Sequence, residues 1–478
     1  MKLTLTLFFS LFYAWTFAQT KECACTEELD FVTGYYERNL ASFGDNVNAK
    51  NRESYEQFKE DLRKEAVTAN TKVDCFRVLT YYVEFFKDNH ASIRMLTENV
   101  NEKDEEGLEK FFNSEIYKSR EVYELKDEDL KQYPLTDIRG IYQLSDVYKI
   151  AIVPSKTAFR DYIGVILESK SKLWKRGQVK LEIKKVGDNR YEAFSYLRNH
   201  SLRFSGRYKL NDGILGGTWT KTSKEGGQNF SAGDSNTLDF KMLNDTTAYL
   251  RIPTFSADSR AKIDSLYELA DAKIRQTPHL IIDVRDNGGG SDDNVSPLLP
   301  YIYTNPIQGD RVELLVTEDN LNLWREALKN AENDPRNYGK GDVAWFRREV
   351  KKMEKAKPNT FILRSKAGKR KIKDISEFPK SVAIIQNQNC ASSCETLLFW
   401  AKQSKKTILV GENSGGYVGY GENFGLYTPC YQYRLTCTMT RYKEQRKYEA
   451  EGIAPDHPLE YTNDWIAQTL EILGEEGI

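Results

Sequence analysis

Residues 280–290 read LIIDVRDNGGG, and this stretch decides the fold class. Its first half is a continuous apolar run, which is typical of a strand buried on both faces of a parallel sheet. Its second half is a polar loop with three glycines. Residues 380–395 repeat the arrangement, because the apolar run KSVAIIQN is followed by the polar loop QNCASSCE. Ligands of open α/β sheets bind beyond the carboxyl ends of the strands, so these two loops are the first candidates for a site.

Strand and helix patterns alternate on both sides of these runs, from about residue 237 onward. The strand patterns are TAYLRI (247–252) and TILVGE (407–412), and the helix patterns are SRAKIDSLYELADAKIRQ (259–276) and SSCETLLFWAKQSKK (392–406). This alternation predicts an α/β core over residues 237–478, with a parallel-centred sheet and crossover helices. A charged helical pattern at about 318–357 interrupts it, and we interpret that pattern as a helical insertion and a candidate lid.

Two other patterns precede this core. Residues 19–118 place apolar side chains three or four positions apart, which predicts an N-terminal helical domain. Residues 119–236 contain short β-branched and aromatic runs separated by turn signals such as LNDG (210–213). They predict a small antiparallel β-domain, either a barrel or a sandwich, with a structural or substrate-positioning role.

The composition excludes one class of partner and limits the chemistry. The 478 residues include 69 Lys and Arg against 70 Asp and Glu, a formal net charge of −1. A nucleic-acid-binding chain needs a basic surface, so no nucleic-acid partner is expected. A mechanism that needs an imidazole has only four candidates, which are His90, His200, His279 and His457.

The first residues predict export. Residues 1–18, MKLTLTLFFSLFYAWTFA, have the basic start, apolar stretch and small final residue of a secretory signal peptide. Their apolar run is shorter than the roughly 20 residues of a spanning helix, and no later segment is apolar for long enough, so no stable membrane span is expected after signal removal. We expect a periplasmic, cell-surface or secreted protein. Lipidation at Cys23 is less favoured, because no convincing lipobox precedes it.

Seven cysteines are too few for a disulfide scaffold and lack the paired spacing of a zinc site, so no metal is expected. Export makes disulfides possible, and Cys23 or Cys25 is a candidate partner for Cys75. Cys430 and Cys437 lie in the alternating stretch YTPCYQYRLTC, which predicts one or two strands.

The two polar loops contain the residues that could take part in catalysis or ligand binding. Ser392 begins a helix pattern, where its Oγ lies near the positive end of the helix dipole and the next N–H groups point toward an oxyanion, an arrangement that suits acyl transfer. The structural alternative is a capping box, because Ser392 and Glu395 have the Ser-x-x-Glu spacing. Cys390 and Cys394 are rival nucleophiles. The glycines at 288–290 form either an anion-binding nest or a tight turn.

Together these segments resemble the core of the tail-specific, or C-terminal-processing, serine peptidases. The resemblance covers about residues 237–478 and rests on LIIDVRDNGGG, then NCASSCETLLFWAKQSKKTILVGENSGG (389–416), then EAEGIAPDHPLE (449–460). The helical segment that ends in Asp-Asn-His (88–90) also looks like the leading domain of exported bacterial members. The β-domain lacks the signature of the PDZ module that many members carry.

The resemblance implies that Ser392 is the nucleophile, because it lies three residues before the glutamate of the Ala-Ser-x-x-Glu motif. One branch of the family pairs this serine with a lysine. Tyr417 stands where that lysine is expected, so a Ser–Lys dyad is not available in this chain.

The chain is closer to the other branch, which resembles the tricorn protease core and uses a Ser-His-Glu set. His90 matches its upstream histidine. Glu449 matches the glutamate before Gly-x-x-Pro-Asp, with Glu451 as a rival. The tricorn-like pattern places a serine just before the histidine, and here that residue is Asn89.

These roles agree with the chemistry of the side chains. A serine hydroxyl needs a base to take its proton, and His90 has an ordinary pKa near neutrality. Glu449 would support the relay, as carboxylates do in other triads. The N–H groups of Gly289 and Ser393 would form the oxyanion hole.

The sequence therefore predicts an exported serine endopeptidase without metal or cofactor. Its partner would be a polypeptide substrate, bound as an extended segment or C-terminal tail that adds to a sheet edge. One alternative is a catalytically inactive ligand- or peptide-binding module on the same fold, as in the retinoid-binding protein of the eye. Another is a cysteine-dependent hydrolase that uses Cys390 or Cys394. His457 is the rival base, and no oligomeric state is predicted.

Overall fold

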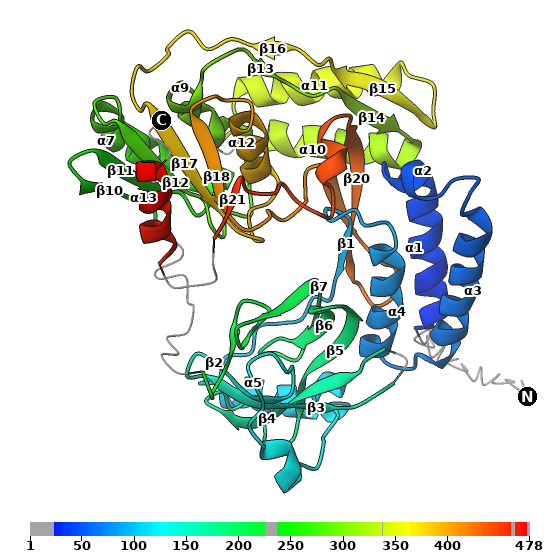
Figure 1. The fold of residues 1–478 in the computed structure, drawn as a ribbon. Coiled ribbons are helices and arrows are strands. Elements are labelled where there is room, and N and C mark those ends of the chain that lie inside the picture. Colours follow the sequence, from blue (N-terminus) through cyan, green and yellow to red (C-terminus); the bar gives the residue numbers. More distant parts are fainter. Residues whose placement is uncertain (1–22, 158, 225–236, 337, 460–463, 476–478) are drawn as a thin grey trace, which may run out of the picture.

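The structure, a computed structural model, describes residues 23–157, 159–224, 237–336, 338–459 and 464–475. The predicted signal peptide, residues 1–18, lies outside the described residues. Figure 1 shows two sheets with their helices in the upper part of the molecule, a β-barrel below them, and N-terminal helices at one side.

A six-stranded sheet forms the centre of the α/β part, in the order β10-β11-β12-β17-β18-β21. Its strands are β10 (Asp239–Asn244), β11 (Thr247–Arg251), β12 (His279–Asp283), β17 (Ser381–Gln386), β18 (Thr407–Gly411) and β21 (His457–Pro458). β10 is antiparallel to β11, and the other neighbouring pairs are parallel. Because β12 and β17 are neighbours, the two polar loops that the sequence singled out leave the sheet side by side.

Both faces of this sheet are covered, which explains the continuous apolar run of β12. Leu280 and Ile282 pack into one cluster with α7 (Arg260–Ile274) and α12 (Ser393–Ala401). Ile281 packs on the opposite face with Trp465 of α13 (Trp465–Glu475). Full burial of each such aliphatic side chain contributes about 1.5–3 kcal/mol. The short helices α8 (Asp292–Val295) and α9 (Leu299–Ile302) follow β12.

A second, five-stranded sheet contains the strand that follows His90. Its path is β1-β20-β14-β15, with β19 paired to β20, and all of these pairs are antiparallel. The strands are β1 (Ser92–Arg94), β14 (Val312–Val316), β15 (Thr360–Ser365), β19 (Tyr420–Tyr427) and β20 (Arg434–Tyr442). The short strands β13 (Ile307–Gln308) and β16 (Lys369–Arg370) pair with each other.

The charged helical pattern that interrupts the core forms two helices, α10 (Glu318–Asn333) and α11 (Lys340–Glu354). They pack on the second sheet, where Trp324 of α10 shares a buried cluster with Met439 of β20. Thr317, just before α10, donates its Oγ1 hydrogen to Asn39 Oδ1 at 2.6 Å. These contacts attach the two helices to the second sheet and to the end of the first N-terminal helix.

Eight antiparallel strands close into a barrel, so of the two predicted forms it is the barrel that occurs. The strands are β2 (Gly140–Leu144), β3 (Tyr148–Pro154), β4 (Tyr162–Ser169), β5 (Val179–Gly187), β6 (Arg190–Tyr196), β7 (Leu202–Asn211), β8 (Ile214–Leu215) and β9 (Trp219–Lys221). In Figure 1, β7 lies on the side of the barrel that faces the two sheets.

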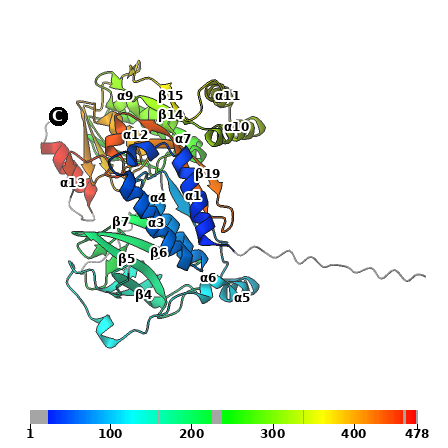
Figure 2. The ribbon, with the colours of Figure 1, turned by 90° about the vertical axis from the view of Figure 1, so that its right-hand side faces the viewer.

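The N-terminal helices lie beside both sheet and barrel. They are α1 (Cys25–Asn39), α2 (Phe43–Asn46), α3 (Arg52–Thr68) and α4 (Lys72–Glu84). Tyr36 of α1 donates its hydroxyl hydrogen to Thr436 O of β20 at 2.6 Å. Arg77 of α4 pairs with Glu182 of β5 at 2.6 Å, and Figure 2 shows α4 beside the barrel strands. The helices therefore connect the second sheet to the barrel.

Two later helices, α5 (Glu105–Asn113) and α6 (Glu115–Lys118), pack on the barrel. Phe111 and Tyr117 place their rings 5.2 and 5.4 Å from the ring of His200. His200 is buried, and its Nε2 lies 2.9 Å from Leu173 O. Burial lowers the pKa of His200 to about 3, so this histidine is a neutral part of an aromatic core.

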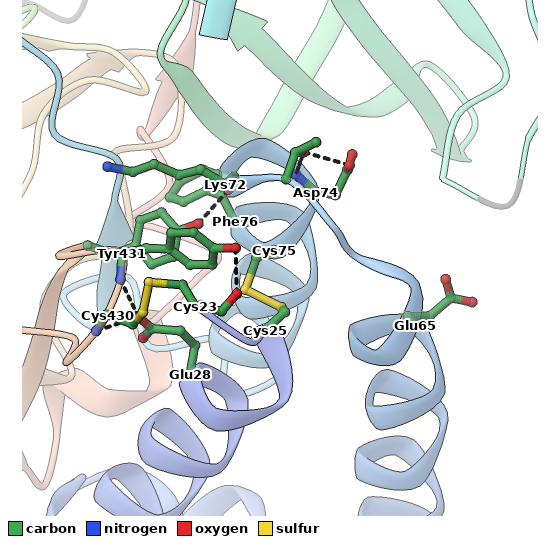
Figure 3. Close-up of a disulfide and its surroundings, with 12 residues drawn as sticks. Cys23, Cys25, Glu28, Glu65, Lys72, Asp74, Cys75, Phe76, Cys430 and Tyr431 are labelled. Carbon is green, nitrogen blue, oxygen red and sulfur yellow. Dashed lines mark hydrogen bonds between the residues drawn. A yellow bond between two sulfur atoms is a disulfide. The ribbon is translucent and has the colours of Figure 1, made fainter. Parts of the chain in front are cut away.

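Two disulfides lie at the start of α1 (Figure 3). Cys25 bonds to Cys75, one of the two predicted possibilities, and Cys23 bonds to Cys430 across 407 positions of sequence. Glu28 supports the second bond, because its Oε1 accepts the N–H of Cys430 at 2.9 Å. The described residues also include three free cysteines, all of them buried, which are Cys390, Cys394 and Cys437.

Candidate active site

Ser392 occupies a sharp turn between β17 and α12. Its backbone angles are φ 55° and ψ −120°, and a non-glycine residue in this positive-φ region costs of the order of 1–3 kcal/mol. The neighbours Ala391 and Ser393 are buried, whereas Ser392 is partly exposed. A strained strand–turn–helix of this kind is a known way to present a nucleophilic serine at the edge of a sheet.

The glycine loop after β12 lies directly against this turn. A Cβ atom on Gly289 would fall 2.8 Å from Ser392 Cβ and 2.9 Å from Ser393 N. Gly289 and Gly290 also have φ values of 90° and 144°, and a Cβ on Gly290 would lie 2.1 Å from Phe255 O. The glycines are therefore required by close packing as well as by backbone conformation.

The two predicted oxyanion donors thus lie next to each other. Ser393 is the first residue of α12, and its N–H is one of the free N-terminal groups of that helix. The N–H of Gly289 donates to Asn287 Oδ1 at 2.9 Å in this structure. A hole with two donors would form when the Gly289 N–H leaves Asn287 and turns toward the substrate oxygen.

His90 lies between α4 and β1, and its hydrogen bond defines its tautomer. Nδ1 is 2.8 Å from Tyr420 O, and a carbonyl oxygen can only accept, so Nδ1 carries the proton. The lone pair is then on Nε2, which is the atom that a general base needs. Burial lowers the pKa of His90, although the carboxylate of Asp88 acts in the opposite direction. The imidazole is consequently neutral near pH 7.

Asp88 is a carboxylate that the sequence reasoning did not single out, although it stands two residues before His90. It is buried, accepts the Thr438 hydroxyl hydrogen at 2.6 Å and the Ala91 N–H at 3.2 Å. Burial raises the pKa of Asp88. It anchors the turn of His90 to β20, and its charge raises the pKa of His90, more than that of Glu422 does.

Glu449 holds the His90 segment through the backbone. Its Oε1 accepts the N–H of Asn89 at 2.9 Å, and its Oε2 accepts those of Val418 and Gly419 at 3.0 and 2.6 Å. Burial, followed by repulsion from Asp88, raises the pKa of Glu449 to about 8.

The rival carboxylate, that of Glu451, is exposed. Of the two glutamates, Glu449 is therefore the one that contacts the His90 segment, through the Asn89 N–H.

Glu395 joins the serine turn to the loop that contacts His90. Its Oε2 accepts the N–H groups of Ser392 at 3.2 Å and Tyr417 at 2.6 Å, and its Oε1 accepts the Ser414 hydroxyl and the Gly416 N–H, both at 2.6 Å. The bond to Ser392 is the glutamate half of the capping box that the structural alternative predicts. The other three bonds show that Glu395 also organises the loop at 414–417.

Tyr417 completes the connection between the two halves of the site. Its ring meets the His90 ring edge to face, with centroids 5.4 Å apart. Asn89 Nδ2 donates to Gly416 O at 2.5 Å, next to Tyr417. One path of contacts thus runs from Ser392 through Glu395 and Tyr417 to His90. It crosses the junction of the two sheets. Tyr417, at the position where the sequence analysis expected the lysine of the Ser–Lys branch, packs its ring against the imidazole.

The rival residues of the sequence analysis lie in other surroundings. His457 sits in β21, opposite Val410 of β18, and His279 Nδ1 is 2.6 Å from Ser381 Oγ. Cys390 donates its Sγ hydrogen to Val284 O at 2.9 Å.

Cys394, the other rival nucleophile, is buried next to Cys390. Burial raises the pKa of the Cys394 thiol well above its usual range. A buried thiol that resists ionisation is a poor nucleophile.

Two kinds of site are absent from the described residues. Within them, His, Cys, Asp and Glu side chains form no group of three or more that could hold a metal ion. No described helix combines the length and apolar character that crossing a bilayer requires.

Residues 246–459 match the family model for peptidase family S41. No curated protein matches the chain. Among solved structures, mature CPAF is 13% identical with a TM-score of 0.49, over 94% of this chain and 96% of that chain. The photosystem II D1 C-terminal processing protease is 12% identical with a TM-score of 0.36, over 91% and 93%. The tricorn protease is 12% identical with a TM-score of 0.38, over 95% and 37%.

Because these TM-scores are below 0.5, the similarity rests on the family match alone. The matched segment contains Gly289, Ser392, Ser393 and Glu449, whereas His90 lies N-terminal to it. Residues 246–459, less than half of the chain, are thus similar to peptidase family S41.

Proposed function

We propose that this chain is an exported serine endopeptidase of the tail-specific class that cleaves peptide bonds through an acyl-enzyme on Ser392. The observation that supports this most is the state of His90, whose Nδ1–H is bound to Tyr420 O so that Nε2 is basic. A serine nucleophile needs a neutral imidazole with a free ring nitrogen to take its proton, and the bond at Nδ1 leaves Nε2 of His90 in that state. The S41 match supports the reaction class.

In the proposed reaction, Nε2 of His90 takes the Ser392 hydroxyl proton as Oγ attacks the substrate carbonyl carbon. The N–H of Ser393 stabilises the oxyanion, joined by Gly289 once its bond to Asn287 opens. The imidazolium then protonates the leaving amine, the C–N bond breaks, and an acyl-enzyme remains. Water, deprotonated by His90, hydrolyses the ester and restores the serine.

Glu449 acts in this scheme by positioning, because it binds the Asn89 N–H and two N–H groups of the Tyr417 loop. Asp88 supports the transient positive charge on His90 through space. The proposed site therefore needs the N-terminal helical segment for its base and residues 246–459 for its nucleophile.

Export is part of the proposal. The signal-peptide pattern of residues 1–18 predicts it. The two disulfides are compatible with an oxidising compartment, since structural disulfides are rare in reducing cytosol.

A fluorophosphonate activity probe tests the proposed function. We expect the wild-type protein to be labelled, Ser392→Ala to lose the label and Cys394→Ala to keep it. Labelling that survives Ser392→Ala would contradict the serine assignment. An unlabelled wild type that cleaves no peptide between pH 5 and pH 9 would instead favour the inactive binding module.

Replacing Glu449 by glutamine tests its positioning role. The amide group of Gln cannot accept the Asn89 N–H while its oxygen serves Val418 and Gly419, so the His90 turn should loosen. We expect kcat to fall about 10- to 100-fold with a smaller change in KM, the range typical of losing a supporting contact. Steady-state kinetics on one peptide measures both constants.

The matched control is Glu451→Gln, two residues away and exposed, which should change kcat less than about twofold. The pH dependence of stability gives a second measurement. The pKa of Glu449 is raised to about 8 in the folded protein, so its contribution is present at acidic pH and is lost as pH rises through 8. Glu449→Gln should flatten that decline. Equal kinetic effects of both substitutions would refute the role of Glu449.

A further inference from the structure

The barrel has a β-bulge on the strand that faces the candidate active site. Tyr191 pairs with Tyr208 and Ala193 pairs with Ser205, so a single β6 residue faces both Gly206 and Arg207 of β7. Bulges of this kind redirect a side chain and are frequent next to active sites. Because of the bulge, the Arg207 side chain departs from the regular alternation of side chains along β7.

Arg207 reaches the loop that contacts the imidazole. Its Cζ lies 5.2 Å from the centroid of the Tyr417 ring, and the centroid of the same ring lies 5.4 Å from that of the His90 ring. Together these spacings place the guanidinium no more than about 11 Å from the imidazole. That distance corresponds to about three residues of extended peptide.

The guanidinium is incompletely paired. Nη2 of Arg207 is buried and has no hydrogen-bond partner among the described residues. Two acidic residues lie near the bulge: Glu192 is the β6 residue that faces it, and Glu84 at the end of α4 has its Oε2 4.0 Å from the place that a Cβ on Gly206 would occupy. Arg207 opposes the rise in the pKa of Glu84 that burial causes, so the two side chains interact without a hydrogen bond. No ion pair within 4 Å joins Arg207 to a carboxylate in the part of the chain that the structure describes. A buried donor without a partner is costly, which is a reason to expect that a ligand satisfies it.

We propose that Arg207 binds a carboxylate group of the peptide substrate, so that the barrel contributes a specificity-determining residue to the S41 site. The inference rests on the proposed peptidase function. A guanidinium is a planar fork of donors that fits the two oxygens of a carboxylate, and stacking on an aromatic ring holds the fork in place. The carboxylate belongs either to an acidic side chain or to the C-terminus of the substrate, within about three residues of the scissile bond.

The experiment compares three forms of one internally quenched peptide. One form ends in a free carboxylate, one ends in an amide, and one ends in an amide but has Glu in place of Gln near the cleavage site. Wild-type protein should prefer one of the two carboxylate forms over the neutral amide by about 10- to 100-fold in kcat/KM, mostly through KM. Which form is preferred identifies the source of the carboxylate.

Arg207→Ala should bring the ratio between carboxylate and neutral peptides close to 1, and Arg207→Lys should keep part of the preference. Arg207→Glu should reverse it, in favour of peptides with Lys at the same position. Arg203→Ala removes an exposed cation from the same strand and serves as the matched control, with the preference retained.

Two results would overturn the inference. One is an equal loss of activity on all three peptides in Arg207→Ala, which would indicate a purely structural side chain. The other is the absence of any carboxylate preference in the wild type. Binding of the same peptides to Ser392→Ala, and to the double variant Ser392→Ala with Arg207→Ala, measures the preference without turnover. If the peptidase proposal fails, no peptide is cleaved. If only the role of Arg207 fails, the peptides are cleaved but the carboxylate preference does not depend on Arg207.

Discussion

Replacement of Ser392 by alanine is expected to lower kcat for peptide hydrolysis by about 10⁴-fold or more, because the acyl-enzyme route needs its Oγ. The remaining rate would come from substrate binding and from oxyanion donors on the backbone, which the substitution leaves in place. KM should change little, since Ser392 contributes small binding area. Single-turnover and steady-state kinetics on one internally quenched peptide measure the loss.

Cys394→Ala is the matched control for this substitution. It removes a buried thiol two residues further along the same turn and helix, so it tests local disturbance without touching the nucleophile. It should retain kcat within about threefold, whereas its inactivation to the level of Ser392→Ala would indicate a cysteine-dependent reaction. The thermal unfolding midpoint of Ser392→Ala should stay equal, since alanine does not remove the strain at φ 55°.

Replacement of His90 by glutamine should lower kcat/KM by about 10³-fold, within the range of general-base catalysis. Glutamine can still donate to Tyr420 O but cannot take the serine proton. His457→Gln, at the rival histidine, should retain the activity. The opposite result, in which His457→Gln is inactive and His90→Gln is active, would replace His90 as the base.

The pH dependence of the wild type gives an independent reading of His90. Burial lowers the pKa of His90 from its ordinary value of 6.5, while Asp88 and Glu422 oppose that shift. The acid limb of kcat/KM should therefore have an apparent pKa below 6.5, and activity should be lost as pH falls through it. Stability follows the same sign, because below pH 6.5 the unfolded chain takes up a proton that folded His90 resists. An acid limb centred well above 6.5 would contradict the assignment.

The local order of the site could be predicted from the sequence, because it depends on short-range patterns. The apolar runs before the two polar loops indicate buried strands, and β12 (279–283) and β17 (381–386) occur there as neighbours. The spacing of Ser392 and Glu395 predicted a helix start, and α12 begins at Ser393. Short β-branched runs predicted antiparallel strands, although a barrel and a sandwich have the same local pattern.

Contacts between distant segments could not be predicted in the same way. The bond from Asn89 to Glu449 joins residues 360 positions apart, and the Cys23–Cys430 disulfide spans 407. The sequence assigned no partner to Cys430 or Cys437, and the fold buries Cys437 as a free thiol. The second use of Glu395, as an acceptor for the loop at 414–417, was likewise hidden, because a capping box accounts fully for its spacing.

The sequence by itself determined which residues have the chemistry: a serine at a helix start, a glycine loop beside it, four histidines and an S41 pattern over residues 246–459. Strand runs, turns and caps depend on neighbours a few positions away, so these features can be predicted from the sequence. The tertiary structure alone decided which nitrogen of His90 is basic and which glutamate holds its turn. It also placed Arg207 of the barrel near the Tyr417 ring, which contacts the His90 ring. Those properties depend on burial and on hydrogen bonds between segments hundreds of residues apart, and no local pattern encodes them.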